Sequence, residues 1–130
     1  MPSNRNKSKM WALQPGLLFY AGKAEGIGGA GLGMVAGAGK GITVTNAGGA
    51  NSPYIFTFEG VGALQDVSFS CQVLEDVGGE QPHQFGIEVD RPNRQVHVQI
   101  YDGANPPAAD DLDVDQELCV MLVERNSVAN

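Results

Sequence analysis

Apolar and polar residues alternate in five segments of the chain, and a sixth segment is apolar on both faces; together these patterns predict six β-strands. Successive side chains of a strand point to opposite faces, so a strand with one buried face is apolar at every second position. Stretches rich in Gly, Pro, Asn and Asp separate the segments, and the turn 90–93 has the length of a hairpin loop. The residues expected to point inward are Ile42, Val44, Tyr54, Phe56, Phe58, Val67, Phe69, Cys71, Val73, Phe85, Ile87, Val89, Val96, Val98, Ile100, Leu118, Val120 and Leu122.

The last segment, residues 117–124, is apolar on both faces. One face holds three of the inward residues, and the other holds Cys119, Met121 and Val123. A strand of this kind is either the centre of a sandwich with a second covered face or a strand that closes a subunit contact. Since three apolar side chains in a row mark an interaction site, we expect Cys119, Met121 and Val123 to form the contact of a homo-oligomer.

Residues 41–130 are therefore expected to form one all-β domain. Six strands in about ninety residues, with no amphipathic helical pattern, favour an antiparallel β-sandwich or a jelly-roll-like barrel. The eighteen inward side chains, each worth roughly 1.5–3 kcal/mol when buried, suffice for a single core.

Residues 1–40 are expected to form an extended arm outside this domain. The first ten residues are polar and cationic, and Gly and Ala dominate residues 22–41. Ordering such a segment costs roughly 1–2 kcal/mol per residue, and little apolar surface offsets that cost. The cluster of Trp11, Leu17, Leu18, Phe19 and Tyr20 nevertheless needs burial. It can fold back on the body or anchor the arm in a neighbouring subunit, and we expect these five residues to bind a partner.

Charge separates the same two regions. The net charge is +4 for residues 1–40 and −11 for residues 41–130. An acidic domain repels nucleic-acid phosphate, so specific DNA or RNA binding is not expected. The asymmetry favours docking of the arm on an acidic surface.

The glycine-rich region contains one match to a nucleotide-binding motif, Gly26-Ile-Gly-Gly-Ala-Gly31. A dinucleotide fingerprint needs a strand before it and a helix after it, and the glycines that follow do not support a helix. No serine elbow or other catalytic arrangement is present. We therefore expect neither a bound cofactor nor an enzyme activity.

Cysteines, histidines and clustered acids have plain structural interpretations. Cys71 and Cys119 lie inside predicted strands without metal-ligand spacing, which favours buried free thiols over a disulfide or a metal site. His83 and His97 are expected at the surface. Asp110, Asp111, Asp113 and Asp115 suggest a calcium site, but they lack the EF-hand order, so we expect a solvated or partner-facing acidic loop and no metal.

The sequence contains no apolar run of membrane-spanning length and no signal segment. We accordingly expect a soluble protein made and kept in a cytoplasm, which includes virions assembled there. A membrane-active protein that inserts residues 11–39 remains an alternative.

Three features together resemble small virion proteins of tailed bacteriophages, in particular capsid cement or decoration proteins. They are the opening segment Lys40-Gly-Ile-Thr-Val-Thr45, the acidic Ala108-Ala-Asp-Asp-Leu112 and the ending Leu122-Val-Glu-Arg-Asn-Ser127. The resemblance covers roughly residues 38–127. It implies a protein without catalytic residues that binds the major capsid protein from outside, as a dimer or trimer with an extended arm.

Two other functions fit the same pattern. A phage tail or head-fibre attachment component has a similar layout, with its long glycine-rich arm. A carbohydrate-binding β-sandwich needs exposed aromatic side chains, for which Tyr54, Tyr101 and Trp11 are the candidates.

Overall fold

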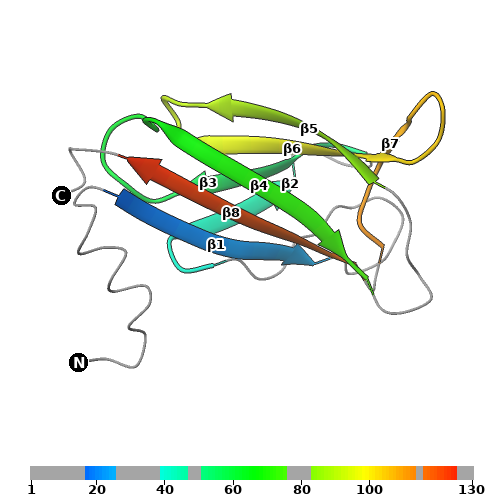
Figure 1. The fold of residues 1–130 in the computed structure, drawn as a ribbon, viewed down its shortest axis with the longest axis horizontal. Coiled ribbons are helices and arrows are strands. Elements are labelled where there is room, and N and C mark those ends of the chain that lie inside the picture. The colour runs from blue at the N-terminus through cyan, green and yellow to red at the C-terminus, as the bar shows by residue number, and fades with distance from the viewer. Residues whose placement is uncertain (1–16, 26–38, 47–50, 76–82, 114–115, 126–130) are drawn as a thin grey trace.

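The computed structural model describes residues 17–25, 39–46, 51–75, 83–113 and 116–125. These residues form two antiparallel sheets packed face to face, with no helix among them (Figure 1), which confirms the predicted all-β sandwich. The strands are β1 (Leu17–Glu25), β2 (Ile42–Asn46), β3 (Tyr54–Phe58), β4 (Val67–Leu74), β5 (His83–Asp90), β6 (Gln95–Asp102), β7 (Ala109–Asp110) and β8 (Glu117–Arg125).

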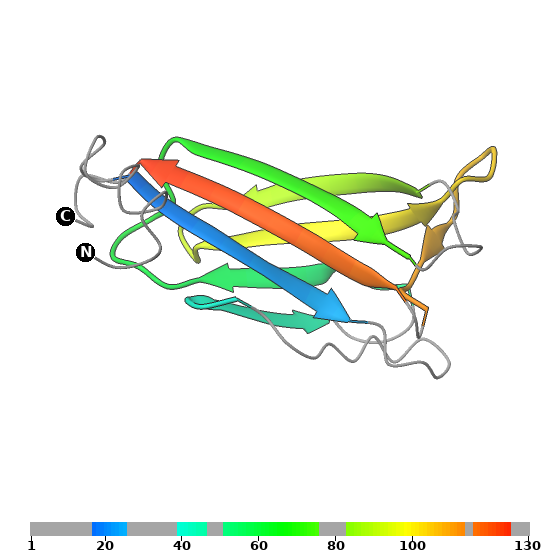
Figure 2. The ribbon, with the colours of Figure 1, turned by 60° about the horizontal axis from the view of Figure 1, so that its bottom comes forward.

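Sheet A has the strand order β1-β8-β4, and sheet B has the order β2-β3-β6-β5 with β7 paired to β6. Figure 2 shows β8 running between β1 and β4. The register of β8 extends from Leu17↔Arg125 to Glu25↔Glu117 on the β1 side. β8, apolar on both faces, is therefore the central strand of sheet A.

The core lies between the two sheets and follows the predicted alternation closely. Leu118, Val120 and Leu122 of β8 face it from sheet A, opposite inward residues of β3 and β6 such as Phe56 and Val98. Ile87 and Val89 of β5 are the exceptions, because 43% and 38% of their surface is exposed. Both lie on an edge strand, where the expected burial is incomplete.

The structure corrects the domain boundary expected near residue 41. Leu17–Glu25, assigned to the arm, is a nine-residue strand of sheet A, with Tyr20 9% exposed and Ala24 fully buried. The glycines and alanines hide the alternation, but they have a packing role. A Cβ on Gly22 would lie 2.5 Å from the backbone nitrogen of Gly39, so this position requires glycine.

A buried ion pair joins the two sheets at one end of the sandwich. Arg94, the residue before β6, directs its guanidinium at Glu124 of β8, with Nη2–Oε1 and Nη1–Oε2 distances of 2.6 and 3.0 Å. The hydrogen bond to Glu124 raises the pKa of Arg94. The backbone nitrogen of Gln65 donates a further bond to the Glu124 carboxylate. A buried charge is tolerated only with such partners.

The same guanidinium also binds the loop that follows β3. Its Nε donates to the carbonyl of Phe58 at 2.8 Å, and its Nη2 donates to the carbonyl of Glu59 at 3.0 Å. Tyr20 of β1 closes the network, because its hydroxyl donates to the Glu59 carbonyl and accepts from Arg94. Gly60 lies directly against the guanidinium, with a φ of 155° and no room for a side chain. Three strands and one loop are thus held at a single point.

Candidate functional site

The outward face of β8 carries the apolar residues predicted to form a subunit contact. Cys119, Met121 and Val123 alternate with the core residues and point away from sheet B. The Met121 side chain is 46% exposed although it lies on the central strand of its sheet. The structure therefore places the three residues together on one accessible surface.

Strand β1 extends this surface to one side. Phe19 lies beside Val123, and Ala21 lies beside Met121 in the antiparallel register. We call Phe19, Ala21, Cys119, Met121 and Val123 the outer patch. On the other side β4 contributes the exposed hydroxyls of Ser68 and Ser70, so the apolar surface ends there.

Charged side chains lie at both ends of the outer patch. Beside Cys119, the Nζ of Lys23 lies 2.6 Å from Glu117 Oε2 and 3.1 Å from Glu25 Oε1. The hydrogen bond to Glu117 raises the pKa of Lys23 to about 12. Beyond Val123, Arg125 lies 3.9 Å from Asp66 across the sheet. An apolar centre with a charged rim is the usual anatomy of a protein–protein interface.

Both cysteines are free thiols, but each is half-buried rather than fully buried as the sequence predicted. Burial raises the pKa of the Cys71 thiol to about 11. The pKa of Cys119 is raised mainly by burial and to a smaller extent by the negative charge of Glu117. Each thiol is therefore protonated near neutral pH, the form that is a poor nucleophile. Within the outer patch Cys119 acts as a small apolar side chain.

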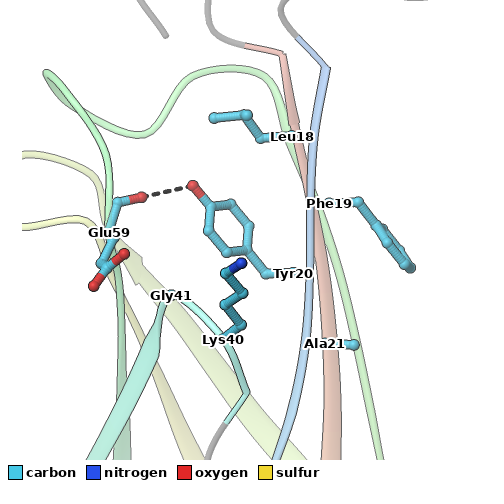
Figure 3. A pocket seen from close by; sticks show the side chains of 7 residues that line it. All are labelled: Leu18, Phe19, Tyr20, Ala21, Lys40, Gly41 and Glu59. Atoms are coloured by element: carbon cyan, nitrogen blue, oxygen red, sulfur yellow. Dashed lines mark hydrogen bonds between the residues drawn. The ribbon is translucent and has the colours of Figure 1, made fainter. Parts of the chain in front are cut away.

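A pocket of about 560 Å³ opens at the edge of β1 that faces away from β8 (Figure 3). In Figure 3 the side chains of Leu18 and Tyr20 point toward Glu59 and Lys40, whereas Phe19 and Ala21 point to the opposite side of the strand. The floor is thus aromatic and aliphatic, and the rim carries one cation and one anion. Tyr20 is already engaged by the carbonyl of Glu59 at 2.6 Å.

The five anchors predicted in the arm are divided by the structure. Tyr20 packs into the core, with its ring edge against Phe58 at a centroid distance of 5.3 Å, and Leu18 packs against the same core. These two residues are therefore not free to anchor the chain in a partner, which corrects that expectation. Leu17 and Phe19 lie on the outer side of β1 and remain candidates, while Trp11 lies outside the described residues.

The aromatic residues proposed for carbohydrate binding are not gathered on the surface. Tyr54 is only 1% exposed, and its hydroxyl accepts a hydrogen bond from the backbone of Leu112. It cannot stack on a sugar, whereas Tyr101 is partly exposed on β6. The carbohydrate hypothesis thereby loses one of its three residues.

The acidic segment before β8 uses its carboxylates in local hydrogen bonds. Asp111 accepts from the backbone nitrogen of Asn51 at 2.8 Å, and Asp110 accepts from the nitrogen of Asp111. Asp113 is described as well, and Asp115 lies outside the described residues. Within the described part of the chain, no three His, Cys, Asp or Glu side chains converge as metal ligands.

No protein-family model matches the chain, and no curated protein or solved structure does so either. In the residues described here, no helix is long and apolar enough to cross a membrane. The site therefore has to be interpreted from its own geometry.

Proposed function

We propose that the chain is a structural protein that acts by binding other proteins, as a cement or decoration protein on a phage capsid. The observation that carries this proposal is the outer patch, a partly exposed apolar surface on sheet A. Its residues are held on a sheet rather than on loops, so little ordering is needed when a partner binds. The partners are the major capsid protein and further copies of the chain itself, in a virion assembled in the host cytoplasm.

The order of residues along β8 supports self-association through this patch. Its outward residues are Glu117, Cys119, Met121, Val123 and Arg125, an order in which an acid and a base lie equally far from Met121. If two copies stack antiparallel on a two-fold axis at Met121, Glu117 faces Arg125 of the second copy. In a parallel stack, Glu117 of one copy would face Glu117 of the other copy, and the two negative charges would repel each other. The charges favour an antiparallel dimer.

The capsid assignment is supported by the resemblance of the sequence and by the sandwich fold. Attachment to a tail or to a head fibre uses the same kind of surface, so it is the alternative that a binding experiment has to separate. Carbohydrate binding is not favoured by any described surface, since Tyr54 is buried.

The test is co-sedimentation of the purified chain with capsids assembled from the major capsid protein of the same phage. The wild-type chain is expected to pellet with the capsids and Met121→Glu is expected to stay in the supernatant. Thr45→Glu, which places the same charge at an exposed position of sheet B, is the matched control and should pellet normally. A wild-type chain that does not pellet with capsids, but does bind purified tails, would overturn the capsid assignment.

The mass in solution tests self-association separately. Light scattering of the wild-type chain and of Thr45→Glu is expected to give twice the monomer mass, and that of Met121→Glu the monomer mass. If Met121→Glu keeps the mass of the wild-type chain, the outer patch is not the contact between copies.

A further inference from the structure

Two apolar residues on the inward face of strand β5 remain accessible to solvent. Ile87 pairs with Val98 and Val89 pairs with Val96, and both β6 partners are completely buried. Ile87 and Val89 share their inward face but are 43% and 38% exposed. In the described part of the chain sheet A has three strands, whereas sheet B has four besides the short β7, so β5 is not fully covered. We call Ile87 and Val89 the β5 ledge.

Strand β4, at the same side of the sandwich, has a free edge that lacks the usual protection. It pairs with β8 on one side, and no described strand pairs with the other. Edge strands normally carry Lys, Pro or a bulge that prevents further pairing. The eight residues Val67–Leu74 contain no charged residue, no proline and no glycine. This edge can accept another strand.

A strand added to β4 would cover the β5 ledge. Neighbouring strands lie about 4.8 Å apart and packed sheets about 10 Å apart, so the new strand would lie above β5. A second sandwich cannot pair here through its own β4, because its sheet B would occupy the space that β5 already fills. The occupant must be a single extended segment without a second layer behind it.

We propose that residues 7–13 of the same chain form this fourth strand of sheet A. Leu17 begins β1 opposite Arg125, and Val67 begins β4 opposite Glu124, so both strands start at the same end of β8. Three strand spacings, roughly 14 Å, separate β1 from the position beyond β4, and the four residue steps from Leu17 back to Leu13 span about that distance. A segment arriving at Leu17 from there runs antiparallel to β4.

The side chains of this segment match the surface beneath it. Trp11 and Leu13 share one face of a strand, at the same two-residue spacing as Ile87 and Val89. Val89 lies at the end of β5 next to the turn that contains Arg94, and Arg94 contacts Glu124 of β8. The β5 ledge is therefore at the same end of the sandwich as Leu13, the last residue of the proposed strand.

Charge favours the same occupant. Residues 1–16 contain three basic residues and no acid, whereas residues 41–130 carry a net charge of −11. Lys7 and Lys9, which precede Trp11 at the same two-residue spacing, would lie with it on the inward face of the new edge strand. Inward-pointing lysines are one of the devices that prevent further strands from adding to a sheet, so the added strand would protect the edge that β4 leaves open. This inference does not depend on the proposed function.

Trp11 is the only tryptophan of the chain, so its fluorescence reports directly on the proposed contact. The wild-type protein is expected to emit at shorter wavelength than the urea-unfolded chain and to be protected from acrylamide. Ile87→Lys is expected to shift the emission to the wavelength of the unfolded chain, and the milder Ile87→Thr is expected to shift it partway. Thr45→Lys, on the opposite face and the far side of sheet B, is expected to leave it unchanged.

Far-UV circular dichroism of each variant verifies that the sandwich is folded. Folded wild-type protein with the emission and acrylamide quenching of the unfolded chain would overturn the proposal, and so would an Ile87→Thr variant that is folded and unchanged in emission. Dilution distinguishes the source of the segment. Emission that is independent of concentration in a monomeric variant such as Met121→Glu supports the same chain, whereas a red shift on dilution would assign the strand to a second copy and overturn the intramolecular arrangement.

Discussion

Arg94, next to β6 of sheet B, and Glu124 of sheet A are joined by two hydrogen bonds of 2.6 and 3.0 Å, with Glu124 fully buried and Arg94 only 6% exposed. The pair fixes the end of β8 against the start of β6, and Tyr20 ties β1 to the same point. This end of the sandwich is also the end at which the outer patch meets Arg125. The ion pair therefore positions one border of the surface that we propose for binding.

Breaking this ion pair should strongly destabilise the fold. Removing one partner of a buried pair typically costs about 3–5 kcal/mol, because the other charge is left without compensation. We expect Glu124→Gln to lower the free energy of unfolding by roughly the lower figure. Arg94→Met should cost more, since it also removes the side-chain donor of the Phe58 carbonyl and one of the two donors of the Glu59 carbonyl.

Urea unfolding of these variants is the measurement, with Arg125→Met as the control. Arg125 is exposed, and its contact with Asp66 spans 3.9 Å, so its replacement should change stability by no more than about 0.5 kcal/mol. If Arg94→Met and Arg125→Met are equally stable, the buried network does not stabilise the sandwich.

A charge swap tests the antiparallel arrangement of two copies. Arg125→Glu should weaken the dimer, because it places two acids opposite each other at each end of the interface. The double variant Glu117→Arg with Arg125→Glu restores opposite charges and should recover much of the affinity. Sedimentation equilibrium gives the dissociation constants. A double variant that dimerises no more tightly than Arg125→Glu would argue for a different stacking.

Truncation separates the first strand from the residues before it. Deletion of residues 1–40 removes β1 and, with it, Tyr20 and Ala24 from the core, so we expect no cooperative unfolding transition. Deletion of residues 1–16 leaves the eight strands of the described residues and should preserve a cooperative transition. Thermal melting followed by circular dichroism distinguishes the two. A stable protein lacking residues 1–40 would contradict the assignment of β1 to the sandwich.

The half-buried thiol of Cys71 should make the protein less stable in alkali. A thiol in an unfolded chain titrates near pH 8.5, whereas burial raises the pKa of Cys71 to about 11. The stability contributed by the protonated thiol is complete below about pH 8.5 and is lost as the pH rises toward 11, because only the unfolded chain releases its proton there. Unfolding of wild-type protein and Cys71→Ala at neutral pH and at about pH 10 should show a steeper loss for the wild-type protein. Parallel losses would contradict this origin.

Alternation predicted the sandwich because most strands bury one face with ordinary apolar residues. In β4, for example, Val67, Phe69 and Val73 alternate with serine and glutamine, and the strand follows that pattern throughout. β1 was not predicted because its inward residues after Tyr20 are Gly22 and Ala24, which are too small to show an apolar alternation. Gly22 has to be small because Gly39 approaches it closely. Composition alone makes such a strand look like a flexible arm.

Of the candidate site, only the residues on β8 could be predicted, because the sequence pattern of that single strand identified them. Cys119, Met121 and Val123 were identified because β8 is apolar on both faces, but their neighbour Ala21 belongs to a strand that alternation did not predict. Glu124 continues the inward series of β8 and could have been expected to need a buried partner. Arg94 could not have been named, since it follows a turn and reaches Glu124 only through the packing of two sheets.

The pairing of β1 with β8 joins the two ends of the described chain, since Leu17 lies opposite Arg125. Sheet B is built from strands that are closer in sequence, whereas sheet A lacks its central strand until β8 is available. On the ribosome, β1 and β4 must therefore wait for β8 to emerge before they find their partner. Contacts between residues so distant in sequence are slow to form. Sheet A therefore forms only after β8 has been synthesised, and the outer patch comes into existence only when β8 has paired with β1.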